Sequence, residues 1–216
     1  MLNKLKAAAA VLCFTLVAGT ARAVTITATQ GTYFNGTVQQ PYASNPDDSR
    51  EILANATDGN PATFYVLGIN GDLTINVSPQ VFASPATVIE VTFGSPNPNF
   101  PEAAKVYLDG VLKGELFNNG TATTNSGAAI VAASTPTGAT FIIPIEGNVS
   151  MLRLLDTTFV NYAAVYTGNN RANDGFDVGE ITYTAVPIPP AALLFGTALI
   201  GMGFLSRRRK QKLSAI

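Results

Sequence analysis

The sequence predicts an all-β fold, a β-sandwich or jelly roll, between residues 24 and 185. Short runs of β-branched and aromatic residues recur along this region, and clusters of Gly, Pro, Asn and Asp separate them. No stretch of the region keeps the apolar period of an amphipathic helix. The one cysteine of the chain, Cys13, precedes the region, so the domain has to fold without a disulfide.

About eight strands are expected, a number that is typical of a sandwich or jelly roll in a region of this length. Asp109-Gly110 lies between two of them and favours positive φ at both positions, which predicts a two-residue hairpin turn. A segment rich in Asn, Gly and Thr, residues 118–127, is expected to form a mobile loop. The expected strands are residues 24–29, 73–77, 88–93, 105–108, 111–117, 141–145, 150–155 and 180–184.

The first 23 residues have the features of a cleaved secretory signal peptide. Lys4 and Lys6 precede an apolar run, and Ala21-Arg22-Ala23 has the small-x-small pattern of a cleavage site. The alternative, an N-terminal membrane anchor, requires a longer apolar run. We therefore expect the mature chain to start at Val24.

A second apolar run, residues 191–205, lies near the C-terminus. It is at or below the ~17–25 apolar residues that span a bilayer. The basic cluster after it predicts a cytoplasmic tail, with the body of the protein on the outer side. An ordinary single-span anchor is the alternative reading. The run stands between two short motifs, Val186-Pro187-Ile188-Pro189 before it and Arg207, Arg208, Arg209 and Lys210 after it.

The charged residues are distributed unevenly along the chain. Residues 24–185 carry five basic and fourteen acidic residues, a net charge of −9, whereas the whole chain has −1. Such a surface excludes nucleic-acid binding through phosphates and suits a secreted or cation-binding protein. The absence of His excludes the hydrolase triads that need it, and one Cys is too few for a structural zinc site. Asp174 and Asp177 can form an acidic patch of their own.

The layout of residues 186–212 resembles the PEP-CTERM sorting tail of Gram-negative bacteria, with the Pro motif, Leu194-Phe195-Gly196 and the Arg-rich end in the family's order. Ile188 stands where the family name motif has Glu. The resemblance implies a precursor held transiently in the inner membrane and an exosortase-type enzyme as its processing partner. It further implies release to the cell surface or extracellular matrix, in association with exopolysaccharide and biofilm.

The most specific internal motif is Ala56-Thr57-Asp58-Gly59-Asn60-Pro61-Ala62-Thr63-Phe64-Tyr65. Taken alone, Asp-Gly-Asn-Pro is turn chemistry. The motif also resembles a loop of discoidin-like, or galactose-binding-like, jelly rolls, whose closing strand contains Glu. Asp177-Val178-Gly179-Glu180-Ile181-Thr182-Tyr183 matches that strand. Phe64-Tyr65 stand where the family usually has Trp.

This second resemblance implies a structural Ca²⁺ site. Its ligands would be Asp58, Thr63 and Glu180, together with backbone carbonyls near Asn55 and Asn60. Calcium takes about 6–8 oxygen ligands, and the site would join the first and last parts of the chain without a disulfide. A hydrogen-bonded turn beside an exposed Glu is the alternative interpretation.

Two non-catalytic functions are consistent with the sequence. The first is an exported surface or matrix protein that binds a polysaccharide through aromatic and polar loop residues, for which Tyr162, Tyr166, Asn170 and Arg171 are candidates. The second is a purely structural matrix or adhesion protein with no specific ligand. Catalysis is not expected, because no pair of carboxylates lies in a recognisable glycosidase motif.

Overall fold

The computed structural model describes residues 24–41, 48–91, 100–169 and 172–187. Several features expected from the sequence lie outside the described residues. They are the signal peptide, Asn170, Arg171, Ile188, Pro189, the apolar run and the basic cluster. None of the helices in the described ranges is long and apolar enough to cross a membrane.

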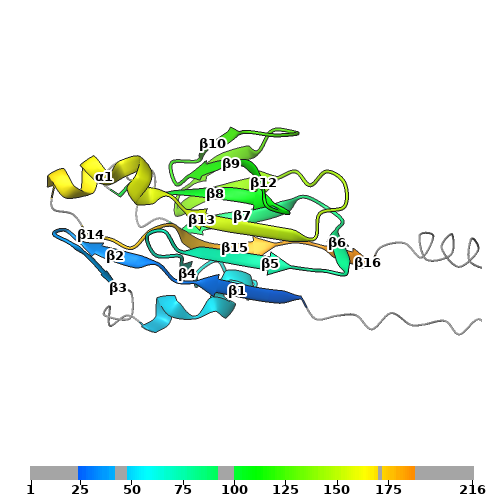
Figure 1. Ribbon diagram of the computed structural model, residues 1–216, viewed down its shortest axis with the longest axis horizontal. Coiled ribbons are helices and arrows are strands. Elements are labelled where there is room, and N and C mark those ends of the chain that lie inside the picture. The colour runs from blue at the N-terminus through cyan, green and yellow to red at the C-terminus, as the bar shows by residue number, and fades with distance from the viewer. Residues whose placement is uncertain (1–23, 42–47, 92–99, 170–171, 188–216) are drawn as a thin grey trace, which may run out of the picture.

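Two antiparallel sheets face each other and form the expected β-sandwich (Figure 1). The six-stranded sheet has the order β1 (Thr25–Thr29), β5 (Asp72–Asn76), β13 (Met151–Asp156), β8 (Ala103–Leu108), β9 (Val111–Phe117), β10 (Thr121–Thr124). The five-stranded sheet has the order β11 (Val131–Thr135), β12 (Gly138–Ile143), β7 (Ala86–Val91), β15 (Asp177–Thr182), β4 (Tyr65–Val66).

Smaller elements cover the two ends of the sandwich. At one end lie the helix α1 (Thr158–Asn169) and a small sheet of β14 (Ala172–Asn173), β2 (Thr32–Asn35) and β3 (Gln39–Pro41). At the other end β6 (Gln80–Phe82) pairs with β16 (Ala185–Pro187) (Figure 1). Two 3₁₀ helices, η2 (Asp48–Glu51) and η3 (Leu53–Thr57), precede β4.

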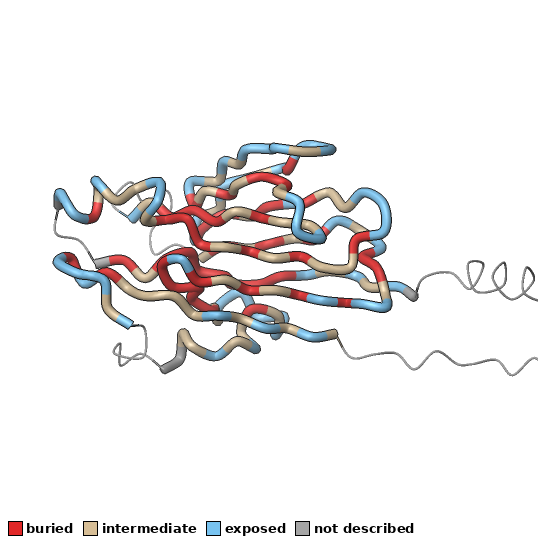
Figure 2. Tube along the Cα trace, in the orientation of Figure 1, coloured by how far each residue is buried: buried red, intermediate tan, exposed pale blue. Residues whose placement is uncertain are grey.

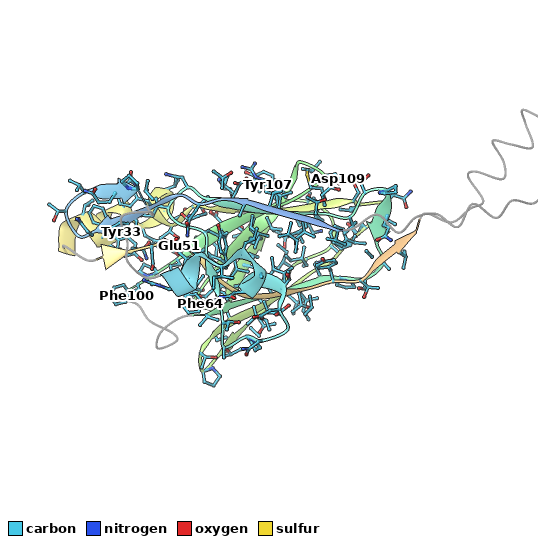
Figure 3. All side chains as sticks on the ribbon, turned by 90° about the horizontal axis from the view of Figure 1, so that it is seen from below. Tyr33, Glu51, Phe64, Phe100, Tyr107 and Asp109 are labelled. Carbon is cyan, nitrogen blue, oxygen red and sulfur yellow. The ribbon has the colours of Figure 1, made fainter. Side chains whose placement is uncertain are left out.

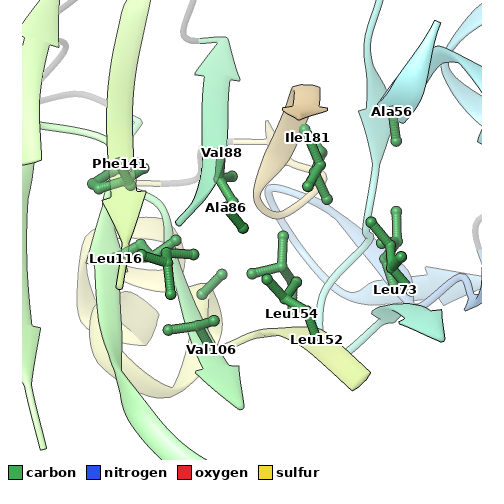
Figure 4. Packing of buried hydrophobic residues seen from close by; sticks show 14 of the residues in the cluster. Ala56, Leu73, Ala86, Val88, Val106, Leu116, Phe141, Leu152, Leu154 and Ile181 are labelled. Atoms are coloured by element: carbon green, nitrogen blue, oxygen red, sulfur yellow. The ribbon is translucent and has the colours of Figure 1, made fainter. Parts of the chain in front are cut away.

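The apolar core lies between the two sheets because alternate residues of each central strand point inward. Figure 4 shows Leu73, Val106 and Leu154 of the six-stranded sheet facing Val88 and Ile181 of the five-stranded sheet, and all five are at most 1% exposed. Figure 2 shows this burial along the central strands and exposure at the loops. Each such side chain contributes about 1.5–3 kcal/mol to folding.

All eight expected strands are present, and their described ends differ from the prediction by at most three residues. Residues 92 and 93 of the expected strand 88–93 lie outside the described residues. The Asp109-Gly110 hairpin is confirmed as well: φ is 45° at Asp109 and 82° at Gly110. The strands that the sequence did not predict are two to five residues long, which is too short for an apolar alternation to be recognised.

The sequence shows no sustained helical periodicity in this region and did not predict α1, which covers one end of the sandwich. Its sequence is rich in β-branched and aromatic residues, which have weak helix propensity. The helix is held by packing instead: Tyr166 is fully buried against Phe34 and Ile69, while Val160 is 72% exposed. Tertiary contacts therefore override the local signal.

The expected loop at residues 118–127 is wrong in part, because residues 121–124 form β10 at the edge of the six-stranded sheet. The turn before β10 is made by Asn119, whose side chain accepts a hydrogen bond from the backbone N–H of Thr121 at 3.0 Å. Gly120 has φ of 77°, which suits this turn. The small polar residues of the segment thus build a hairpin.

The folded domain extends slightly beyond the boundary at residue 185 that the sequence indicated. Val186 pairs with Val81, and Pro187 pairs with Gln80, as part of β16. The first two residues of the predicted Pro motif therefore belong to a paired strand of the domain.

Candidate functional site

The predicted calcium loop, residues 58–63, follows η3, and η3 packs against β15. Asp58 Oδ1 accepts a hydrogen bond from the backbone N–H of Asn60 at 2.8 Å, and Asn60 Oδ1 accepts one from Ala62 N–H at 3.2 Å. Each contact spans two residues, which is the Asx-turn geometry expected of Asp-Gly-Asn-Pro. These local hydrogen bonds shape the loop.

Three oxygens of this loop converge. Thr63 Oγ1 lies 2.8 Å from Asp58 Oδ2 and 2.8 Å from the carbonyl oxygen of Asn60. A hydroxyl group carries only one hydrogen, so it cannot donate fully to both acceptors at once. The Asn60 carbonyl oxygen also accepts the backbone N–H of Thr63 at 3.0 Å, so the hydroxyl hydrogen can point to Asp58 without leaving that carbonyl unpaired.

Glu180 of β15 joins the loop from the far end of the sequence. Its Oε2 accepts a hydrogen bond from the backbone N–H of Gly59 at 2.7 Å, and Glu180 is only 5% exposed. Burial raises the pKa of Glu180, the Gly59 N–H opposes that rise, and the nearby charge of Asp58 adds to it. The structure thus brings Asp58, Thr63 and Glu180 together, and Glu180 is buried rather than exposed.

The oxygen set fits a calcium ion in kind. It offers two carboxylates, a hydroxyl and a backbone carbonyl, which are ligands that Ca²⁺ accepts. Neither Asp58 nor Glu180 forms a salt bridge within the described part of the chain. In that part no three Asp, Glu, Cys or His side chains are grouped so that they could hold a metal. An ion here would therefore depend on the oxygens of Thr63 and Asn60.

The aromatic candidates for glycan binding lie on α1. Tyr166 is fully buried and its hydroxyl donates to the carbonyl oxygen of Pro101 at 2.6 Å, so the prediction that it contacts a ligand is wrong. Tyr162 is half-buried and packs against the cluster of Phe34, Ile69 and Tyr166. Burial raises the pKa of both hydroxyl groups. Residue type alone does not predict whether an aromatic side chain is buried in the core or exposed on the surface.

A cluster of buried carboxyl groups lies beneath α1 and β14. Glu102 is 6% exposed and Asp177 is 3% exposed. Within the described ranges, Glu102 Oε2 and Asp177 Oδ1 have no hydrogen-bond partner. Burial raises the pKa of both groups well above the usual range, and the neighbouring acidic groups Asp174 and Glu90 add to the effect. The acidic patch expected around Asp174 and Asp177 is therefore present, and Glu102 belongs to it.

Asp156 connects this end of the molecule. It is 1% exposed at the end of β13, and its carboxylate accepts hydrogen bonds from Asn70 N–H, Thr158 N–H, Thr158 Oγ1–H and Phe176 N–H. Burial raises its pKa to about 6, and the donors oppose that rise. One side chain thus fixes β13, the start of α1 and the segment that leads into β15.

Sequence reasoning missed a pocket at the opposite end, which is lined by Lys113 and Glu146 among others. Three separate segments build it, and one of them contains the Asp109-Gly110 turn. The only sequence signal near it is the Asp109-Gly110 turn, which predicts the hairpin and not the hollow beside it.

No family model and no curated protein matches this chain. Among solved structures it is similar to the F5/8 type C domain of a Bacteroides fragilis protein, with 13% identity over 74% of this chain and 90% of that chain and a TM-score of 0.38. It is also similar to a cryo-EM structure of the arabinofuranosyltransferase AftD from mycobacteria, with 15% identity over 77% of this chain and 13% of that chain and a TM-score of 0.39. The function has to be argued from the chain's own residues.

Proposed function

We propose that this chain is an exported, non-catalytic binding module that attaches to a polysaccharide at the cell surface or in the extracellular matrix. The observation that carries the proposal is the loop at residues 58–63, whose oxygens meet Glu180 at the side of a β-sandwich. This combination agrees with the discoidin-like resemblance of the same residues. The net charge of −9 over residues 24–185 is consistent with a secreted protein.

Calcium would serve this module as a structural ion. Asp58, Thr63 and Glu180 would hold it, with the Asn60 carbonyl as a further ligand. When bound, it would neutralise two carboxylates that lie in each other's field and would tie the loop to β15. The residues themselves already place the loop, through the Asx turn and the Gly59 N–H.

Export would use the two ends of the chain. The N-terminal segment would be removed as a signal peptide, and the PEP-CTERM-like tail would anchor the precursor in the inner membrane until an exosortase-type enzyme cuts it. The order of the Pro motif, the apolar run and the basic cluster supports this route. The cell would then be a Gram-negative bacterium, and the product would be a surface or matrix protein.

A catalytic role has little support from the acidic groups. The most perturbed carboxyl groups, Glu102 and Asp177, are buried, so a polysaccharide cannot reach them in this conformation. A glycosidase needs two carboxyl groups on either side of the scissile bond. We therefore keep binding as the function.

The test is a glycan array probed with the purified full chain, in calcium and in EGTA. Selective binding to a bacterial polysaccharide or its fragments, without hydrolysis, supports the proposal. Hydrolysis of the bound glycan would show that the chain is an enzyme and not a binding module. No binding to any glycan would favour the second candidate, a structural matrix or adhesion protein without a specific ligand.

A further inference from the structure

A pocket of about 410 Å³ opens at the end of the sandwich that lies opposite α1. The tip of the β8–β9 hairpin, the segment after β10 and the connection from β12 to β13 form it. Its volume falls within the ~300–1,000 Å³ of small-molecule sites. Figure 3 places Asp109, at the hairpin tip, far from Tyr33 and Phe100 at the other end. This hollow, called the Lys113 pocket below, is separate from the residue 58–63 loop.

Lys113 is the notable group of this pocket. It is 3% exposed, and its Nζ lies 3.9 Å from Glu146 Oε2, which is too far for a hydrogen bond. No hydrogen bond from Nζ is formed within the described part of the chain. An ammonium group carries three donors, and Lys113 Nζ is not one of the fully buried unpaired side-chain atoms of the described residues, so it is not completely enclosed. Its donors are therefore available to an acceptor that enters the pocket.

Two carboxylates border the same pocket, and they differ in what they can still bind. Asp109 is occupied, because it accepts hydrogen bonds from Ser150 N–H and Met151 N–H at 3.2 and 2.8 Å. Among the described residues Glu146 accepts a hydrogen bond from the Ala128 N–H alone, and 59% of its side chain is exposed. A carboxylate has about four lone-pair positions, so Glu146 can accept further donors from a ligand.

The rest of the lining is aliphatic and polar. Leu108, Val111 and Val149 supply apolar surface, and Asn148 adds an amide group. A ligand thus meets donors from Lys113, acceptors from Glu146 and apolar surface beside both. With one cation against two carboxylates, an anionic ligand is repelled. Hydroxyl groups satisfy both neighbours, because each one donates and accepts.

We propose that the Lys113 pocket binds a neutral sugar unit, with one hydroxyl accepting from Lys113 Nζ and a neighbouring hydroxyl donating to Glu146. The proposal rests on the polysaccharide-binding function proposed above and names the subsite and the class of saccharide. It assigns recognition to the end of the sandwich opposite the aromatic residues of α1.

The experiment is titration calorimetry of the full chain with neutral and uronic-acid oligosaccharides selected on a glycan array. We expect neutral saccharides to bind, and Lys113→Met to weaken that binding by about tenfold or more, since a hydrogen bond to a charged group contributes ~1.5–3 kcal/mol. The matched control is Lys105→Met, in the middle of β8 and outside the pocket. It should bind as the native chain does.

A second variant tests the pocket independently, in case Lys113→Met does not fold. Val111 is 61% exposed at the rim, so Val111→Trp should block the pocket while it leaves the core intact, and Val160→Trp on α1 is its control at 72% exposure. If both pocket variants keep native affinity, the subsite is wrong although glycan binding stands. Preference for uronic acids overturns the neutral class. If the native chain binds no saccharide, both proposals fail.

Discussion

The two ends of the sandwich use charged residues in opposite ways. At the α1 end, Asp156 receives four hydrogen bonds, and Glu102 and Asp177 are buried beside it. At the other end, Lys113 lines an open pocket. Its Nζ lies 3.9 Å from Glu146 Oε2, which is a long distance for an ion pair. The same strands join both ends, since β13 runs from Met151 near the pocket to Asp156 near α1.

The difference indicates which charges stabilise the fold and which remain available for binding. A buried carboxylate that accepts several hydrogen bonds contributes to one fixed arrangement, and its loss leaves buried donors without partners. A cation that lines a pocket without a close partner keeps its donors for a ligand. Burial by itself does not separate the two, because Asp156 and Lys113 are both nearly inaccessible.

The largest expected effect is that of Asp156→Ala. It removes the acceptor of two backbone N–H groups from distant segments, of Thr158 N–H and of the Thr158 hydroxyl. Since each buried unpaired donor costs about 1–3 kcal/mol, we expect a loss of about 4 kcal/mol or more in the free energy of unfolding. Denaturant titration measures it.

The matched control is Asp109→Ala at the pocket end. Asp109 also accepts backbone hydrogen bonds, but it lies in an exposed turn where water can replace it. Its loss should be clearly smaller. Equal losses for the two variants would remove the contrast between the two ends.

Calcium should have the next largest effect. A ligand at 100 times its Kd stabilises a protein by about 2.7 kcal/mol, and each kcal/mol corresponds to roughly 2–4 °C in Tm at this size. Millimolar Ca²⁺ should therefore raise Tm by several degrees, and more than Mg²⁺ does. Asp58→Ala should abolish this rise. Asp72→Ala, which breaks an ion pair with Arg153, should keep it.

A Tm that does not respond to calcium or EGTA would show that residues 58–63 form a hydrogen-bonded turn and not a calcium site. In that case the closeness of Asp58 and Glu180 would be balanced by the hydrogen bonds from Gly59, Asn60 and Thr63. The contrast between the two ends does not depend on this result, because neither Asp156 nor Lys113 takes part in the loop.

The carboxyl cluster predicts how stability depends on pH. The pKa values of Glu102 and Asp177 are raised in the folded state by burial, so the folded protein binds more protons than the unfolded chain. Their contribution is fully present below the usual carboxyl pKa of about 4 and is lost as pH rises through the folded-state pKa. We expect a lower Tm at pH 8 than at pH 5.

Glu102→Gln sharpens this test, because it keeps the shape of the neutral carboxyl group and cannot ionise. The variant should lose less stability between pH 5 and pH 8 than the native protein, by about 1.4 kcal/mol for each unit of the pKa difference removed. Glu146→Gln, at the exposed pocket end, removes one carboxyl group outside the cluster and is the control. An unchanged profile in Glu102→Gln would mean that this cluster does not titrate between these pH values.

The fold was largely predictable because its long strands carry their signal locally. The alternation in β5, β7 and β13 identifies the core, and Asp109-Gly110 identifies a hairpin. The helix α1 was not predictable in the same way, because packing of Tyr166 rather than helix propensity stabilises it.

The candidate site was predictable where one short motif carries it and unpredictable elsewhere. The Asp-Gly-Asn-Pro turn is encoded by adjacent residues, whereas the partners of Lys113 come from segments after β10 and β12. Glu102 and Asp177 are likewise far apart in the sequence: Glu102 precedes β8 of one sheet, Asp177 begins β15 of the other, and the packing of the two sheets brings them together. Residue type therefore predicted the turn, and topology alone determined the pocket and the carboxyl cluster.

The smallest expected effect tests the proposed cleavage of the tail, which follows the end of the sandwich that carries the pocket. Val186 and Pro187 are paired with β6, and Pro187 stands at the end of its strand, where its missing N–H costs least. A protease requires an unpaired segment, so a paired strand has to open locally first. We expect mass spectrometry of the secreted protein to find a C-terminus after Pro187 and before the apolar run. Val186→Asp, which weakens β16 at a residue 36% exposed, should allow an earlier cut, whereas Val160→Asp on α1 should not. A secreted protein that still contains residues 191–205 would show that the run is a membrane span and not a removable tail.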